Sequence, residues 1–298
     1  MTNQMLEVQA AQEYTGHQID LCYLIPLFKE VLDFHTHCNE EKDTVADIVS
    51  GRTMGNNLGG MAAVINTGND MNWTGDDLAA ANTYGFGRLS FNTELTAEEI
   101  AREWIRQTLN LPKKEEDILC SMLLRSREIY ERYTSPLGIG WMVTPNGHYG
   151  PSVDGYEYSR WGTYHRADHL GIGVDRTDKG TGYAFQYNEP NASIYNSPEK
   201  CPDELVLFFH HLPYTHVLHS GKTVIQHIYD THFEGYEEVL EMAGKWDSLK
   251  GEIDDGIFGN VKERFGRQID NAHEWCDQVN SYFFRKSGIA DEKGRQIW

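Results

Sequence analysis

The order of elements in the first 95 residues restricts the fold of this chain more than any other feature. Residues 6–16 start with alternating apolar and polar side chains and stop at a glycine, which predicts a strand that enters a loop. Residues 60–66 form a short apolar run bounded by glycines, as is typical of a buried strand. Helical patterns follow them, over residues 26–34 and 75–88. This order predicts a parallel sheet with helical crossovers, whose two strands need further partners.

From Thr96 onward the pattern is mainly helical. Thr96 and Glu99 have the spacing of a capping box before an apolar helical stripe. Further helices are predicted over residues 115–133, 202–211, 222–245 and 258–284. We therefore expect the chain, of 298 residues, to divide into a strand–helix part over residues 1–95 and a mainly α-helical part over residues 96–298.

A long stretch without periodicity interrupts the helical part at about residues 136–190. Loops of this length are functional or disordered, and its aromatic content argues against disorder. Residues 147–169 combine Tyr, Trp, His and Arg, and sugars bind to such surfaces by stacking on aromatic rings and hydrogen bonding to polar groups. The alternative is a tightly packed connector held by Tyr hydroxyl groups, and the two interpretations are compatible.

The charge of the chain argues against several partners. Lys and Arg number 26 and Asp and Glu 45, so the formal charge is 26 − 45 = −19, which disfavours nucleic acid and membrane surfaces. The longest apolar stretch, residues 21–31, is interrupted by Pro26, Lys29 and Glu30, and predicts no membrane span. Five scattered cysteines and the lack of a signal peptide pattern favour a reducing, cytoplasmic location.

Six histidines fall between residues 210 and 232, and imidazole is the commonest metal ligand among side chains. His216 and His219 have the spacing of one helical face, but no Glu or Cys completes a known ligand pattern. Structural or substrate-facing histidines are the favoured interpretation, with a metal-dependent hydrolase as the weaker alternative.

Glu13 is the sharpest candidate for chemistry. It lies at the carboxyl end of the first predicted strand, where barrel enzymes place catalytic groups, and Asp70 and Trp73 follow the second strand at the equivalent rim. A solvated loop glutamate is the alternative for Glu13.

Several longer motifs resemble one family over nearly the whole chain. They are residues 138–145 (GIGWMVTP), 148–165, 171–177 (GIGVDRT), 201–205 (CPDEL) and 219–230 (HSGKTVIQHIYD), with residues 12–14, 61–70 and 72–75. They resemble the C-terminal part of the xylan alpha-glucuronidases, glycoside hydrolase family 67.

The resemblance implies an inverting hydrolase without cofactor or metal. Its substrates would be aldouronic acids from glucuronoxylan, in which (4-O-methyl)glucuronic acid is α-1,2-linked to the terminal xylose of a xylooligosaccharide. Residues 1–95 would then be the incomplete C-terminal end of a catalytic (β/α)8 TIM barrel, in an α/β plus all-α chain. The helical domain beyond them implies a homodimer in the complete enzyme.

The resemblance also assigns roles to residues. Glu13, in the motif Gln12-Glu13-Tyr14, is expected to be the general base, and Trp161 and Arg166 are expected to form part of the glucuronate pocket. His165, with Asp70 and Trp73, is expected to bind substrate.

The family's acid glutamate and its partner aspartate lie upstream of residue 1, so a truncated chain is expected. The alternative of another class is a non-catalytic fragment that binds sugar or dimerises.

Overall fold

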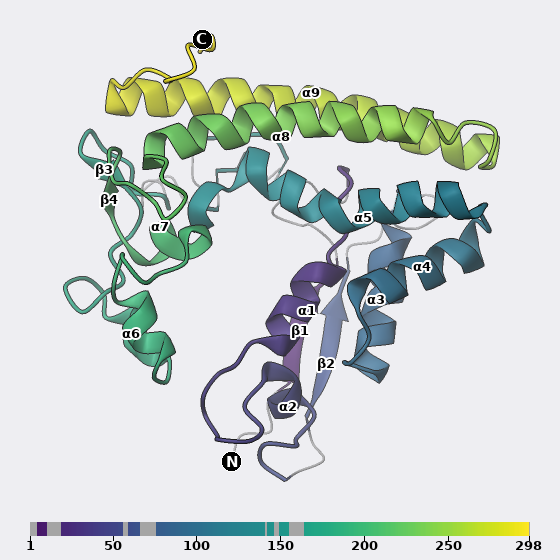
Figure 1. Cartoon of the computed structure of the whole chain (residues 1–298), viewed down its shortest axis with the longest axis horizontal. Coiled ribbons are helices and arrows are strands. Elements are labelled where there is room, and N and C mark those ends of the chain that lie inside the picture. The colour runs from purple at the N-terminus through teal and green to yellow at the C-terminus, as the bar shows by residue number, and fades with distance from the viewer. Residues whose placement is uncertain are drawn as a thin grey trace. The chain divides into compact units, whose positions relative to one another are not determined.

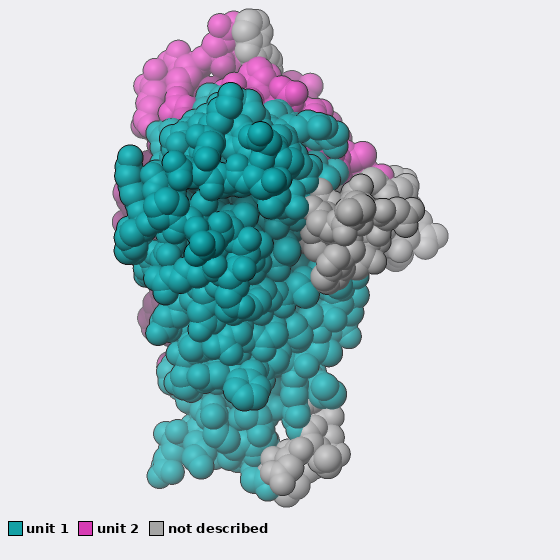
Figure 2. Space-filling model, turned by 90° about the vertical axis from the view of Figure 1, so that its right-hand side faces the viewer, with its two compact units in different colours: residues 1–130, 239–268 teal, residues 131–238, 269–298 magenta. Residues whose placement is uncertain are grey.

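The computed structural model describes residues 5–10, 19–55, 59–65, 76–140, 142–145, 149–154 and 164–297. The chain forms two compact units, coloured separately in Figure 2. Unit 1 comprises residues 1–130 and 239–268, and unit 2 comprises residues 131–238 and 269–298. Each unit is therefore assembled from two separate stretches of sequence.

Unit 1 contains the two predicted strands, β1 (Met5–Gln9) and β2 (Gly60–Val64), which lie side by side in Figure 1. They pair in parallel over their whole length, from Met5 opposite Gly60 to Gln9 opposite Val64. The connection between them contains α1 (Ile25–Asp33) and α2 (Val45–Val49). The predicted parallel pairing is confirmed, but the described residues of unit 1 show two strands only and no TIM barrel.

Three further helices of unit 1 follow β2 in the sequence. They are α3 (Ala80–Phe91), α4 (Ala97–Thr108) and most of α5 (Lys113–Thr134). Unit 1 also includes the end of α8 (Val224–Asp247) and the beginning of α9 (Asp255–Ser287). The capping box of α4 is confirmed, since the Glu99 backbone N–H donates to the Thr96 hydroxyl (3.1 Å) and the Thr96 N–H to the Glu99 carboxylate (2.9 Å). One face of α4 buries Ile100, Trp104 and Ile105.

Close packing of α1 against α3 explains why residue 85 is a glycine. A Cβ atom at Gly85 would lie 2.3 Å from Cγ1 of Ile25, a side chain that is itself fully buried. Any larger residue at this position would force the two helices apart.

Unit 2 is irregular between its helices. Its elements are η1 (Pro136–Gly138), β3 (Gly171–Ile172), η3 (Tyr183–Gln186), α6 (Asn191–Tyr195), η4 (Asp203–Leu205), α7 (Val206–Phe209), β4 (Leu212–Pro213) and parts of α8 (Val224–Asp247) and α9 (Asp255–Ser287). The helices predicted over residues 222–245 and 258–284 are confirmed by α8 and α9. The described residues of the non-periodic stretch at about 136–190 form few regular elements.

The helix predicted over residues 202–211 is observed as η4 and α7 over residues 203–209 and is wrong only at its last two residues. Helix α7 ends at Phe209, and the chain continues as β4, which pairs antiparallel with β3. Proline at position 213 cannot continue a helix, and β3 supplies the hydrogen-bonding partner that the local sequence does not reveal.

None of the described helices combines the length and the apolar character needed to cross a membrane. All five cysteines are free thiols, and four of them are buried.

We expect unit 2 to lose stability as the pH falls, because His232 of α8 is completely buried and must be neutral there. Burial lowers the pKa of its imidazole from 6.5 to about 4, although a hydrogen bond to the Ile228 carbonyl opposes the shift. A group with a depressed folded-state pKa contributes stability above its unfolded pKa and loses that contribution as the pH falls through the folded value. The loss between about pH 7 and about pH 4 should be about 3 kcal/mol.

Urea unfolding at a series of pH values measures this effect. The variant His232→Phe should show a shallower pH dependence than the wild type, whereas His169→Phe, at an exposed histidine, should match the wild type. Equal pH profiles for His232→Phe and the wild type would contradict the prediction.

Candidate functional site

Four of the six predicted site residues lie outside the described residues, namely Glu13, Asp70, Trp73 and Trp161. Their roles stay predictions. The structure does describe the other two, His165 and Arg166, and the residues that flank Glu13.

The flanks of residues 11–18 are tightly held within unit 1. Before them, the Ala10 N–H donates to the Val64 carbonyl (2.9 Å) and extends the β1–β2 pairing to the carboxyl ends of both strands. After them, three backbone N–H groups donate to buried side chains, namely Leu21 to Gln268 (3.0 Å), Tyr23 to Ser126 (2.8 Å) and Leu24 to Asn82 (2.7 Å). The segment that carries Glu13 thus begins and ends at fixed points of the fold.

These three buried side chains were not predicted as part of the site. Gln268 lies 247 residues from its partner Leu21, so no local pattern connects them. The Asn82 side chain forms a second hydrogen bond, because its amide N–H donates to the Cys22 carbonyl (3.0 Å). Each of them satisfies backbone groups that would otherwise be buried without partners.

Arg166 of unit 2 is exposed, and within the described residues its guanidinium forms no ion pair. Its backbone has φ of +49°, in the left-handed region that residues other than glycine rarely adopt. An unpaired guanidinium can bind a carboxylate through two parallel hydrogen bonds. In a chain of net charge −19, this exposed cation is a candidate anchor for an anionic ligand.

His165, next to it, is 2% exposed. Its Nε2 lies 2.8 Å from the Val153 carbonyl, and its Nδ1 accepts from the Ala167 N–H at 3.0 Å. Burial lowers the pKa of this imidazole, although the Val153 hydrogen bond opposes the shift. Both ring nitrogens are therefore engaged by the backbone, which leaves little for a substrate.

A tight turn fixes the chain immediately after Arg166. The Asp168 carboxylate accepts from the N–H groups of Leu170 (2.7 Å) and Gly171 (2.9 Å), and the Tyr214 hydroxyl donates to the Asp168 carbonyl (2.8 Å). An Asp followed three residues later by a Gly is typical of a turn, so this feature could be predicted from the sequence. The contact with Tyr214 could not, since Tyr214 lies 46 residues away.

Because it has no side chain, Gly173 can lie close to the main chain of His210. It has φ of +103°, and a Cβ atom there would lie 2.1 Å from the His210 carbonyl oxygen. Its N–H donates to the His165 carbonyl (2.8 Å), so the segment from residue 165 to residue 173 closes on itself.

The histidines between residues 210 and 232 do not act together. Their hydrogen bonds go to separate groups, with His211 at the Gly173 carbonyl (2.9 Å), His219 at Asp203 (2.8 Å) and the Glu199 carbonyl (3.0 Å), and His232 at the Ile228 carbonyl (2.7 Å). His216 and His219 lie in a turn region and not on one helical face. Across the described ranges, no three His, Cys, Asp or Glu side chains are arranged to hold a metal ion.

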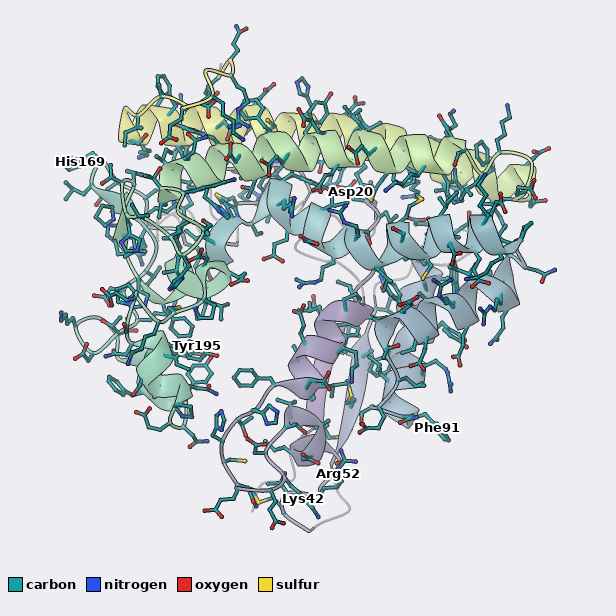
Figure 3. All side chains as sticks on the ribbon, viewed as in Figure 1. Asp20, Lys42, Arg52, Phe91, His169 and Tyr195 are labelled. Atoms are coloured by element: carbon teal, nitrogen blue, oxygen red, sulfur yellow. The ribbon has the colours of Figure 1, made fainter. Side chains whose placement is uncertain are left out.

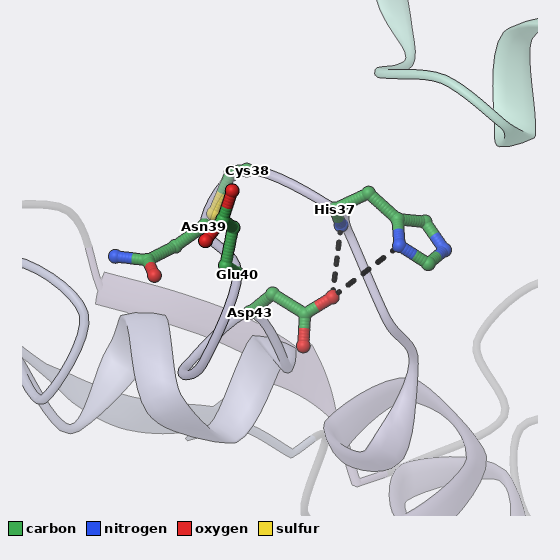
Figure 4. A pocket seen from close by; sticks show the side chains of 5 residues that line it. All are labelled: His37, Cys38, Asn39, Glu40 and Asp43. Atoms are coloured by element: carbon green, nitrogen blue, oxygen red, sulfur yellow. Dashed lines mark hydrogen bonds and ion pairs between the residues drawn. The ribbon is translucent and has the colours of Figure 1, made fainter.

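A pocket in unit 1 contains none of the predicted site residues. Figure 4 shows its lining, with Asp43 accepting from the His37 N–H (3.1 Å) and lying 3.6 Å from the His37 ring. These contacts organise the loop between α1 and α2, and we assign no ligand to it.

Comparison with known proteins gives consistent matches over the whole chain. Residues 1–73 match the family model described as the glycosyl hydrolase family 67 middle domain, and residues 74–296 match the one described as the glycosyl hydrolase family 67 C-terminus. Similar curated proteins include the probable alpha-glucuronidase A of Aspergillus oryzae, 43% identical over 296 residues, and alpha-glucuronidase A of Aspergillus tubingensis and of Emericella nidulans, both 41% identical over 296 residues. Each alignment covers 99% of this chain and 35% of the relative. The chain thus spans about a third of the length of the curated relatives it matches.

Proposed function

The chain belongs to glycosyl hydrolase family 67, and we propose that it forms the C-terminal part of an alpha-glucuronidase that acts on glucuronoxylan-derived oligosaccharides. The bond cleaved would be the α-1,2 linkage between (4-O-methyl)glucuronic acid and a terminal xylose. Glucuronic acid differs from neutral hexoses by its carboxylate, so the site needs a cation that is free to bind it.

Arg166 is the observation that carries this proposal. It is exposed, it has no ion-pair partner within the described residues, and its flanking residues are fixed by hydrogen bonds on both sides. Because the backbone on both sides is fixed, only the Arg166 side chain has to be ordered when a carboxylate binds. It also opposes the repulsion between an acidic sugar and an acidic protein.

The reaction proposed is hydrolysis with inversion. Glu13 removes a proton from water, and the oxygen of that water attacks the anomeric carbon from the face opposite the leaving xylose. A carboxylic acid from residues N-terminal to this chain would donate its proton to the glycosidic oxygen as the bond breaks. Trp161 would stack on the glucuronosyl ring while Arg166 holds the carboxylate.

A hybrid enzyme provides the test, with these 298 residues in place of the matching part of the Aspergillus tubingensis relative. Proton NMR follows the sugar released from xylobiose that carries one 4-O-methylglucuronic acid. The β-anomer of glucuronic acid should accumulate first, because inversion converts an α-glycoside into the β-hemiacetal. If the α-anomer came first, inversion would be wrong, and with it the role of Glu13 as the base of a single inverting displacement.

Replacing Arg166 in the hybrid enzyme should weaken substrate binding. For Arg166→Met we expect kcat/KM to fall about 10- to 100-fold, since a charge-assisted hydrogen-bonded pair is lost. Arg166→Lys should recover part of the loss, because a lysine keeps the charge but not the two parallel hydrogen bonds. Lys179→Met removes an exposed cation of the same unit and should change kcat/KM little. Equal losses in Arg166→Met and Lys179→Met would show that only net charge matters.

A further inference from the structure

The backbone at Arg166 is held in an unfavourable conformation, and we propose that His165 is the positioning residue that holds it there. The inference rests on the proposed function, in which Arg166 binds the carboxylate of the sugar. It assigns His165 a role through Arg166 and not a contact with substrate.

The conformation of Arg166 needs an external cause. A φ of +49° is unfavourable for a side chain with a Cβ atom, and nothing about an exposed arginine demands it. Such residues persist where the surroundings determine the backbone, and they are frequent at ligand-binding sites. The residues on either side of Arg166 should therefore carry the constraint.

His165 supplies that constraint through both ring nitrogens. The Val153 carbonyl can only accept a hydrogen bond, so Nε2 must carry a proton and donate to it at 2.8 Å. The Ala167 N–H can only donate, so Nδ1 must be unprotonated to accept it at 3.0 Å. The two bonds together select one neutral tautomer, and the Nδ1 bond closes a turn around Arg166.

The imidazole is itself fixed by packing within unit 2. Its ring lies edge-on to Tyr282 and to Phe283 of α9, with ring centroids 5.5 Å and 5.8 Å away. The His165 carbonyl accepts from the Gly173 N–H at 2.8 Å, so the main chain before Arg166 is also held. His165 thus links α9, the Val153 segment and the Arg166 turn.

Protonation of His165 should release the turn. An imidazolium would direct an Nδ1–H at the Ala167 N–H, and two donors cannot pair. Among the described residues, the titratable groups near His165 include Lys286 and Tyr282 of α9 and Asp154 beside Val153. Burial has the largest effect and favours the neutral form, so the turn is intact near neutral pH and opens in acid.

The full 298-residue protein allows a direct test, with glucuronic acid as the probe and glucose as its uncharged control. Backbone NMR of residues 164–171 follows binding, and hydrogen exchange of the Ala167 amide follows the turn. His165→Phe keeps an aromatic ring against α9 but removes both hydrogen bonds. We expect it to weaken glucuronic acid binding about tenfold and to expose the Ala167 amide. His169→Phe, four residues further at an exposed site labelled in Figure 3, should leave both unchanged.

A second variant and the pH dependence keep the test valid if His165→Phe misfolds. Asn accepts from the N–H two residues ahead in the same way as Nδ1, so His165→Asn should restore most of the binding and the amide protection. Because burial lowers the pKa of His165, wild-type affinity should fall only as the pH drops below the ordinary imidazole value of 6.5, whereas His165→Asn, which cannot titrate there, should lack that fall.

The outcomes separate the two proposals. The role of His165 would be overturned by a folded His165→Phe that binds glucuronic acid as the wild type does, or by a wild-type affinity that depends on pH in the same way as that of His165→Asn. A wild type that does not bind glucuronic acid, while its Ala167 amide depends on His165, would overturn the role of Arg166 and support the positioning role of His165.

Discussion

Replacing Glu13 by Gln in the hybrid enzyme should reduce kcat about a thousandfold while KM changes little. Gln is nearly isosteric with Glu but cannot accept a proton from water, so the substrate still binds and the attacking water is no longer activated. The fold should be unaffected, because the segments on either side of residues 11–18 are held by backbone and buried side-chain hydrogen bonds that do not involve Glu13.

Glu7 is the matched control for this substitution. It lies on β1, six residues before Glu13 in the sequence, its side chain is exposed, and Glu7→Gln makes the same change of charge. We expect Glu7→Gln to keep the activity of the unmodified hybrid. A kcat of Glu13→Gln within a few-fold of that value, measured on the same substrate, would remove Glu13 from the mechanism.

Replacing Asp230 by Asn should cost unit 2 about 3–5 kcal/mol of unfolding free energy. The Asp230 side chain is 1% exposed, and its carboxylate binds Lys222 (2.7 Å), Lys293 (2.8 Å) and Arg295 (2.5 Å). Burial by itself would raise the pKa of this carboxyl, but the hydrogen bonds from these cations hold it well below its usual range. Asn cannot compensate three cations, so the variant leaves them clustered around a neutral group.

Calorimetry or urea unfolding at neutral pH measures this loss. The control is Glu234→Gln on the same helix, because Glu234 is half-exposed and lies 3.6 Å from Lys293. That variant should lose less than about 1 kcal/mol. The C-terminal segment should be released first in Asp230→Asn, since Lys293 and Arg295 attach it to α8. Equal unfolding free energies of the two variants would contradict the claim that Asp230 stabilises unit 2 by pairing with three cations.

Features determined by neighbouring residues could be predicted from the sequence. Alternating and apolar runs located β1 and β2, and the Thr96 and Glu99 pair located the start of α4. The parallel pairing also followed, because a helical crossover between two strands permits little else. The end of α7 did not follow, because it depends on β3 about 40 residues earlier.

The sequence offered candidate site residues, whose roles stay predictions, but not how their side chains are arranged. Motifs pointed to His165 and Arg166, but gave both the same role as substrate contacts. The structure separates them, since Arg166 is exposed and His165 is buried with both ring nitrogens engaged. Burial and backbone hydrogen bonds of this kind depend on segments such as α9, more than 100 residues away, and no local pattern contains them.

The ratio of kcat/KM for two matched substrates tests the proposed function most directly. The hybrid enzyme is assayed on xylobiose that carries an α-1,2-linked glucuronic acid and on the same compound with glucose in its place. We expect efficient release of glucuronic acid and a preference over glucose of about 100-fold or more, because only the former has a carboxylate for Arg166 to bind. Equal rates on the two substrates, or release of glucose alone, would contradict the assignment.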